Sequence, residues 1–271
     1  MSKFIAAMDH SGGSSPGVLE RYGYPNAHEL PHEVVMDDIH LMRLRMASSP
    51  DFVKENIWAA ILYKDTVERG MVPVLHEKGI QAYLKVDSGC EEDGSLKDFD
   101  VAGMIDYALE NNCTGTKMRS IVKDEQNLDA ILSQQFELAQ QIYRAGLMPI
   151  VEPEIPIDHP MKSNYEHKLR DELAERLDAF IGKCILKLTL PDQDNFYSSI
   201  MKHNNVYKVV GLSGGYTTAQ ACRRLECQAG MSASFSRALS EGLFITQSDD
   251  EFNTQLSSNI SMIVQAGIGN E

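Results

Sequence analysis

The chain has 271 residues, of which 43% are hydrophobic and 24% charged, an ordinary composition for a globular protein with a large core. Its formal net charge of −14 argues against nonspecific binding to nucleic acid or to an anionic membrane surface. We therefore expect any phosphate site to be built locally, from backbone N–H groups and a few cations.

Short apolar runs, taken in chain order, predict strands, and several of them end in a polar residue followed by glycine or proline. The predicted strands are 4–8, 57–63, 82–86, 115–118, 147–151, 184–190, 206–212 and 232–235. Most of the intervals have a helical period, and the predicted helices are 32–45, 99–110, 128–145, 164–181, 217–228 and 250–266. The long first interval also contains a polar, turn-like piece at 23–31.

Strands that alternate with helices are typical of an α/β fold with a parallel sheet. Eight repeats over 271 residues give a mean spacing of about 34 residues (271 divided by 8), which favours a single (β/α)8 barrel over residues 1–271. An open, doubly wound sheet is the alternative.

Lys187 lies inside the apolar run 184–190, where its ammonium group would lose solvation unless its proton can leave. Two interpretations are open. Lys187 lies at an edge or pairs with a carboxylate, as most strand lysines do, or it points into a site and acts as an amine nucleophile that forms a Schiff base with a carbonyl substrate.

Polar residues at the ends of other predicted strands favour the second interpretation. They are Asp9, Lys85, Asp87, Lys117, Arg119, Glu152 and Glu154. Residues i and i+2 of a strand point the same way. The pairs Lys117/Arg119 and Glu152/Glu154 therefore each project either into one shared space or onto a solvated face. In a barrel these ends meet at the active-site face, and we expect Lys117 to lower the pKa of Lys187 by repulsion.

Two glycine-containing turns suggest phosphate cradles on opposite sides of the barrel mouth. The first is Ser213-Gly214-Gly215, between a strand and a helix, with Arg237 on the next strand. The second is Ser11-Gly12-Gly13-Ser14, with Lys85 nearby. The serines could also be simple turn formers.

The segment His28-Glu29-Leu30-Pro31-His32 matches the HExxH pattern of zinc hydrolases. That pattern requires a continuous helix, and Pro31 disfavours one at this point. We expect no metal and no cofactor here, and we expect the segment to lead into the next helix.

Seven motifs, in order over residues 4–265, resemble class I (Schiff-base) fructose-bisphosphate aldolase in its short bacterial form. They are Asp9-His10-Ser11-Gly12-Gly13-Ser14, Leu84-Lys85-Val86-Asp87-Ser88-Gly89, Gly115-Thr116-Lys117-Met118-Arg119, Pro149-Ile150-Val151-Glu152-Pro153-Glu154, Leu186-Lys187-Leu188-Thr189, Leu212-Ser213-Gly214-Gly215 and Ala233-Ser234-Phe235-Ser236-Arg237-Ala238-Leu239.

The resemblance implies a reversible cleavage of fructose 1,6-bisphosphate into dihydroxyacetone phosphate and glyceraldehyde 3-phosphate. It implies that Lys187 forms the Schiff base, that Asp9 and Lys117 assist carbinolamine formation and cleavage, that Glu152 donates and accepts protons, and that Glu154 orients Lys117. Ser213, Gly214, the Ser236 backbone and the Arg237 guanidinium would hold the 1-phosphate. Ser11, Ser14 and Lys85 would face the 6-phosphate end, and Arg119 would lie near the 6-phosphate or order the site.

The sequence departs from the animal-type pattern at four places. Leu188 replaces a proline, Met118 a tryptophan and Ser236 a glycine, and no terminal tyrosine tail follows the last helix. We therefore expect Glu152 or another group to exchange the C3 proton, or the exchange to be slow.

Two other functions are alternatives: a related Schiff-base aldolase or transaldolase acting on another sugar phosphate, and a noncatalytic sugar-phosphate-binding barrel. The five cysteines form no CxxC pair, the opening apolar run is too short for a signal peptide, and no stretch approaches 18 apolar residues. We expect a cytoplasmic protein, and the sequence leaves a homo-oligomer open.

Overall fold

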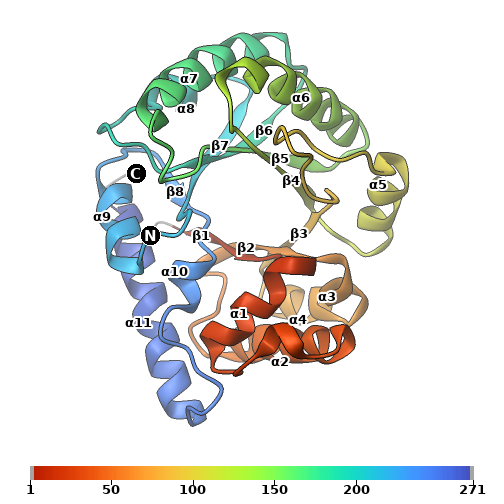
Figure 1. Cartoon of the computed structure of the whole chain (residues 1–271), viewed down its shortest axis with the longest axis vertical. Helices are drawn as coiled ribbons and strands as arrows, with labels where there is room; N and C mark the ends of the chain where they lie inside the picture. The colour runs from red at the N-terminus through yellow and green to blue at the C-terminus, as the bar shows by residue number, and fades with distance from the viewer. Residues whose placement is uncertain (1–2, 269–271) are drawn as a thin grey trace.

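A computed structural model describes residues 3–268 and shows eight parallel strands hydrogen-bonded in sequence order, from β1 to β8 (Figure 1). This order confirms the predicted (β/α)8 barrel and excludes the open, doubly wound sheet, whose strand order reverses. The strands are β1 Phe4–Met8, β2 Ile57–Leu62, β3 Gln81–Lys85, β4 Gly115–Ile121, β5 Met148–Glu154, β6 Cys184–Thr189, β7 Val206–Leu212 and β8 Ser232–Ala233.

Helices cover the outside of the barrel, with α5, α6 and α7 around one half and α1 to α4 around the other (Figure 1). The α-helices are α1 Ser15–Tyr22, α2 His32–Ser48, α3 Lys64–Glu68, α4 Met71–Glu77, α5 Val101–Glu110, α6 Leu128–Arg144, α7 Lys162–Ala179, α8 Ser198–Met201, α9 Thr218–Glu226, α10 Arg237–Ser240 and α11 Asp249–Ile268. Three short 3-10 helices are η1 Gly12–Ser14, η2 Ala27–Glu29 and η3 Glu125–Asn127.

The barrel closes between β1 and the short strand β8. The N–H of Ala7 donates to the carbonyl of Phe235 at 3.1 Å, and the hydroxyl of Ser232 donates to the carbonyl of Lys3 at 2.5 Å. The predicted strand 232–235 is therefore shorter in the structure, although its last residue still takes part in closure.

Alternation of side chains along the strands divides the core into two parts. One cluster fills the barrel interior, and its members are Ile5, Ala7, Ala59, Ile61, Tyr83, Ile150, Ile185 and Val210. The larger cluster lies between the strands and the surrounding helices. The interior cluster is apolar, and the positions two residues beyond Ala7, Tyr83, Ile150 and Ile185 along their strands carry the charged residues Asp9, Lys85, Glu152 and Lys187.

Helix α6 is fixed to its surroundings by three glutamines. Each side-chain amide donates to the C=O and accepts from the N–H of one and the same residue, at distances between 2.8 and 3.2 Å. The pairs are Gln134 with Leu96, Gln135 with Glu152 and Gln140 with Ile181. Gln135 thus connects the outer helix layer to the strand that carries a candidate catalytic carboxylate.

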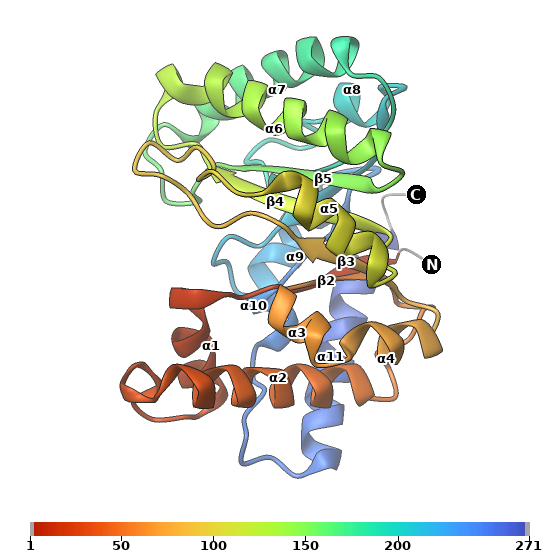
Figure 2. The ribbon, with the colours of Figure 1, turned by 90° about the vertical axis from the view of Figure 1, so that its right-hand side faces the viewer.

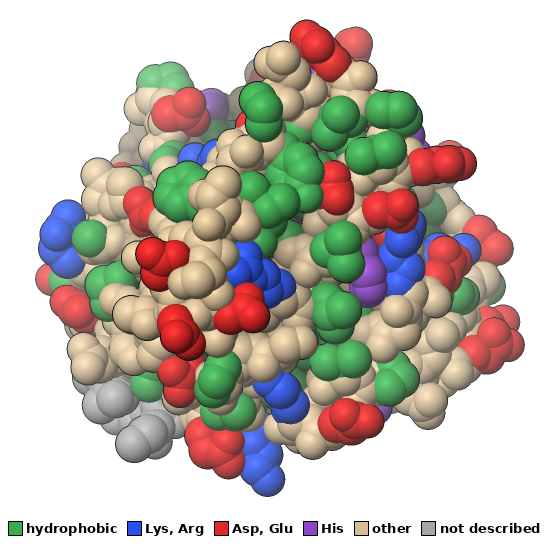
Figure 3. All heavy atoms as spheres, turned by 90° about the horizontal axis from the view of Figure 1, so that it is seen from below, with side chains coloured by type: hydrophobic (Ala, Val, Ile, Leu, Met, Phe, Trp, Pro, Cys, Tyr) green, Lys and Arg blue, Asp and Glu red, His purple; other side chains and the backbone are tan. Residues whose placement is uncertain are grey.

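The loops and helix that follow β1 lie at one end of the barrel, and the start of β1 lies at the other (Figure 2). On the face shown in Figure 3, acidic side chains are scattered among apolar ones and do not form one patch. Within residues 3–268, no helix is both long enough and apolar enough to cross a membrane.

Candidate active site

A cavity of about 670 Å³ opens at the C-terminal ends of the strands. Every residue that the sequence singled out for catalysis or phosphate binding lines it. These residues are Asp9, Ser11, Ser14, Lys85, Lys117, Arg119, Glu152, Glu154, Lys187, Ser213, Gly214, Gly215, Ser236 and Arg237. The strands bring them together from positions that span most of the chain, as expected for the active-site face of a barrel.

Lys187 points into this cavity from the buried strand β6. It lies two residues beyond the interior residue Ile185, on the same face of the strand. The residue is only 4% exposed, and its Nζ lies 3.1 Å from Oε1 of Glu152. The lysine is therefore both buried and paired, which combines features of the two interpretations drawn from the sequence.

The carboxylate of Glu152 lies between two ammonium groups. Its second oxygen, Oε2, is 3.0 Å from Nζ of Lys117, and that Nζ is also 2.6 Å from Oδ2 of Asp9. The charges thus alternate along the row Lys187, Glu152, Lys117 and Asp9. The sequence suggested direct repulsion between the two lysines, whereas the structure places a carboxylate in contact with both.

The pKa values in this row follow from burial and from the neighbouring charges. Burial alone would raise the pKa of Asp9, but Lys117 and then Lys187 outweigh it and hold that pKa well below its ordinary value. Burial would lower the pKa of Lys117, but Asp9, Glu152 and Asp87 raise it above its ordinary value. Asp9 is therefore a carboxylate and Lys117 an ammonium group at neutral pH.

Glu154 does not contact Lys117 as the resemblance implied. Its Oε2 lies 3.0 Å from Nη1 of Arg119, and Asp9 and Glu152 hold Lys117 instead. The strands β4 and β5 are staggered so that each β4 cation faces a carboxylate further along β5. Burial raises the pKa of Glu154, and Arg119 opposes that shift.

The turn 213–215 after β7 has the backbone shape expected of an anion cradle. Gly214 and Gly215 have φ values of 55° and 115°, in the left-handed region that favours glycine. A Cβ on Gly214 would lie 2.6 Å from Cγ2 of Ile157. The guanidinium of Arg237 lies beside this turn and donates to the carbonyl of Gly215 at 3.3 Å.

The turn after β1 also lines the cavity, but it does not lie opposite the turn 213–215 as the sequence suggested. Because β1 adjoins β8 where the barrel closes, only β8 separates the two turns. Ser14 Oγ donates to the carbonyl of Ser11 at 2.9 Å and accepts from the N–H of Ser11 at 3.2 Å. Lys85 lines the same cavity from the end of β3, and its Nζ is 2.7 Å from Oδ1 of Asp87. Asp87 also accepts from the N–H groups of Gly89 and Arg119, so it ties the ends of β3 and β4 together.

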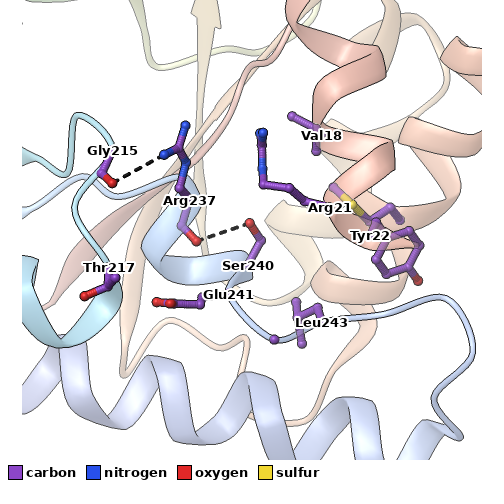
Figure 4. A pocket seen from close by; sticks show the side chains of 11 residues that line it. Val18, Arg21, Tyr22, Gly215, Thr217, Arg237, Ser240, Glu241 and Leu243 are labelled. Carbon is purple, nitrogen blue, oxygen red and sulfur yellow. Dashed lines mark hydrogen bonds between the residues drawn. The ribbon is translucent and has the colours of Figure 1, made fainter. Parts of the chain in front are cut away.

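Arg21 is a pocket residue that the sequence analysis missed. It projects from α1, a helix for which the sequence analysis made no prediction. A second pocket of about 330 Å³ adjoins the cavity, and Figure 4 shows the guanidinium groups of Arg21 and Arg237 at the same end of it. Burial, followed by the charge of Arg237, lowers the pKa of Arg21.

Ser234 was noted on the last strand but was given no role. It is 1% exposed, it lines the cavity, and its Oγ has no hydrogen-bond partner among residues 3–268. A buried hydroxyl without a partner is unfavourable, and here it is available to a ligand.

The HExxH-like segment does not form a metal site. Its first histidine belongs to η2, Leu30 is extended, and α2 begins only at His32. His28 Nε2 instead lies 3.6 Å from Oε2 of Glu20. Within the described part of the chain, no group of three or more His, Cys, Asp or Glu side chains is arranged to hold a metal ion.

Comparison with curated proteins gives full-length matches. The chain is 44% identical to fructose-bisphosphate aldolase class 1 of Synechocystis, and the match covers 98% of this chain and 93% of that protein. It is 40% identical to the class 1 enzyme of Porphyromonas gingivalis and 39% identical to that of Clostridium acetobutylicum, each over 98% of this chain and 95% of the relative. No protein-family model matches the chain.

Solved structures share the fold at low sequence identity. Fructose-bisphosphate aldolase of Plasmodium falciparum superposes with a TM-score of 0.77 and 19% identity, over 99% of this chain and 91% of that one. An archaeal fructose 1,6-bisphosphate aldolase gives a TM-score of 0.61 at 10% identity, over 97% and 94% of the two chains. The barrel is thus shared with distant aldolases, and on the full-length identity to the curated relatives the chain belongs to the family of class 1 fructose-bisphosphate aldolases.

Proposed function

We propose that this chain cleaves fructose 1,6-bisphosphate reversibly into dihydroxyacetone phosphate and glyceraldehyde 3-phosphate through a Schiff base on Lys187. The observation that carries the proposal is the Glu152 carboxylate, which lies 3.1 Å from Nζ of Lys187 and 3.0 Å from Nζ of Lys117 in a buried site. A lysine needs an adjacent proton acceptor to act as a neutral amine, and Glu152 is that acceptor.

The steps assign one role to each charged side chain. Lys187 loses its proton to Glu152 and attacks the C2 carbonyl, and Glu152 returns a proton to the carbinolamine oxygen as water leaves. Asp9, an ionised carboxylate, accepts the C4 hydroxyl proton while the C3–C4 bond breaks, and the iminium group takes up the electron pair. Lys117 stays cationic and stabilises the C2 oxygen, which becomes negative as the amine attacks.

The cavity lining contains two groups of residues that suit the two phosphates of a bisphosphate. The turn 213–215, Ser236 and Arg237 hold the 1-phosphate, and Ser11, Ser14 and Lys85 face the 6-phosphate, with Arg119 beside it. Two phosphate sites favour a bisphosphate over a sugar that carries a single phosphate group. Comparing kcat/KM for fructose 1,6-bisphosphate and fructose 1-phosphate tests this assignment, and equal values would favour the alternatives.

Borohydride trapping tests the covalent step. Reduction in the presence of dihydroxyacetone phosphate should attach the triose to Lys187, as mapped by peptide mass spectrometry. Cleavage activity that persists in Lys187→Ala would contradict the mechanism, and tight binding without turnover would identify a noncatalytic barrel.

We also propose that the reaction is independent of metal, since the iminium group replaces a metal as the electron sink. EDTA should leave kcat unchanged. The free thiols at all five cysteines support a reducing, cytoplasmic setting, which localisation of a tagged chain tests. Sedimentation tests whether the barrel associates into a homo-oligomer.

A further inference from the structure

His10 and Ser236 meet where the first and last strands of the barrel close. The Nε2 atom of His10 lies 2.6 Å from Oγ of Ser236, and both residues line the candidate active-site cavity. His10 directly follows Asp9, and Ser236 directly precedes Arg237. This contact therefore joins the two loops that carry a candidate catalytic carboxylate and a candidate phosphate-binding guanidinium.

A buried arginine, Arg43, holds the backbone carbonyl of His10. Nη2 of Arg43 donates to the carbonyl of His10 at 2.6 Å, and Nη1 of Arg43 donates to the hydroxyl of Thr66. Arg43 is 0% exposed. Arg43 therefore restrains the backbone carbonyl of His10, and the contact with Ser236 is what places the ring.

The surroundings of the ring select one tautomer. Nδ1 of His10 is buried and has no hydrogen-bond partner within residues 3–268. A buried N–H without an acceptor is rarer and more costly than a bare acceptor nitrogen, so the proton belongs on Nε2. Burial, followed by the charge of Arg43, also lowers the pKa of His10 to about 3, which keeps the ring neutral.

A neutral ring with its proton on Nε2 donates to Oγ of Ser236. The hydroxyl proton of Ser236 is then free to point into the cavity, beside Arg237 and the turn 213–215. We propose that His10 is a positioning residue that turns the Ser236 hydroxyl into a hydrogen-bond donor for the phosphate of the triose. The inference rests on the proposed function and adds a side-chain donor to the backbone role expected of Ser236.

The test compares borohydride trapping of two ketones on the full chain. Dihydroxyacetone phosphate carries the phosphate and dihydroxyacetone lacks it, so the ratio of their half-saturation concentrations isolates the phosphate contact from damage to the Schiff-base site. In His10→Phe and in Ser236→Ala, we expect the half-saturation concentration of dihydroxyacetone phosphate to rise by about 10- to 100-fold relative to that of dihydroxyacetone. The reason is that a hydrogen bond to a charged group is lost.

Two further variants distinguish positioning from a general structural role. His10→Phe combined with Ser236→Ala should be no worse than Ser236→Ala alone, since both act through one hydroxyl. His10→Gln, whose amide can still donate to Ser236, should recover part of the ratio. His28→Phe, which removes a histidine outside the cavity, is the matched control and should leave the ratio unchanged.

Nitrogen-15 NMR of the imidazole in the wild-type chain tests the tautomer without any variant. A proton on Nδ1, or an unchanged trapping ratio in both single variants, would overturn the inference. If the wild-type chain shows no label on Lys187 with either ketone, the proposed function fails instead, and the NMR result still decides the tautomer.

Discussion

Glu152 contacts both lysines of the site, and its negative charge is central to the proposed proton transfers. Glu152→Gln keeps the size of the side chain but removes the charge and the proton acceptor. We expect kcat to fall by about 10²- to 10⁴-fold, the usual contribution of a positioned acid or base. Steady-state cleavage kinetics measure this loss.

The matched control is Glu137→Gln on the exposed face of α6. It removes the same charge from the protein without touching the cavity, so its kcat should equal that of the wild type. A Glu152→Gln variant with kcat within twofold of the wild type would show that another group transfers the protons.

His10 also gives the stability of the protein a defined dependence on pH. Its pKa is about 3 in the folded chain and 6.5 in the unfolded chain, so the unfolded state binds more protons between these two values. The free energy of unfolding should therefore fall, by up to about 1.4 kcal/mol per pH unit, as the pH is lowered from 6.5. Below about pH 3 both states are protonated and this contribution stops changing.

Urea unfolding at several pH values between 7 and 4.5 measures this slope, and His10→Gln supplies the reference. Because every other titrating group is common to both chains, the difference between their slopes belongs to His10. Equal slopes in the two chains would mean that the ring takes up a proton in the folded state as readily as in the unfolded one.

At the scale of elements, α6 fixes strand β5 through the side-chain amide of Gln135. This amide donates to the carbonyl of Glu152 at 3.2 Å and accepts from its N–H at 3.1 Å, and Gln135 is fully buried. Gln135→Met removes both bonds at similar volume. We expect the free energy of unfolding to fall by about 1–3 kcal/mol and kcat to fall more than KM rises, since Glu152 loses its fixed position.

Gln140 provides a control on the same helix. It makes the same pair of bonds to the backbone N–H and C=O of Ile181, at 2.9 and 3.0 Å, but at a half-buried position away from the cavity. Gln140→Met should therefore change stability slightly and leave kcat unchanged. Equal effects of the two variants on kcat would show that Gln135 serves the helix and not Glu152.

The strands could be predicted from sequence because each is buried on two faces and reads as an apolar run. Helix α1 could not, since Ser15, Pro16 and Gly17 are also common turn formers, although proline is well tolerated in the first turn of a helix. Once α1 was missed, no signal remained that Arg21 would reach the cavity.

The ion-pair partners in the site could likewise be predicted only in part from the sequence. A spacing of two residues showed correctly that Lys117 and Arg119 share a face, as do Glu152 and Glu154. It could not show the stagger between β4 and β5, which depends on strand tilt around the whole barrel. The partner of Glu154 therefore emerged only from the structure, as Arg119.

At the scale of the molecule, the candidate phosphate sites draw on both ends of the chain. The loop after β1 supplies Ser11 and Ser14, and the loops after β7 and β8 supply the turn 213–215 and Arg237. The barrel closes between β1 and β8, where the last strand has only two residues. A ligand bound at this closure connects the first and last strands, so its binding should stabilise the complete barrel against unfolding.

Dihydroxyacetone phosphate at about 100 times its Kd should raise the free energy of unfolding by about 2.7 kcal/mol, because it binds only the folded chain. Arg237→Met should lose most of this increase at the same ligand concentration, since it removes a guanidinium from the phosphate site. Arg144→Met, on the exposed end of α6, removes one positive charge elsewhere and should keep the full increase. Thermal unfolding with and without ligand measures all three chains, and an undiminished increase in Arg237→Met would place the phosphate away from the closure of the barrel.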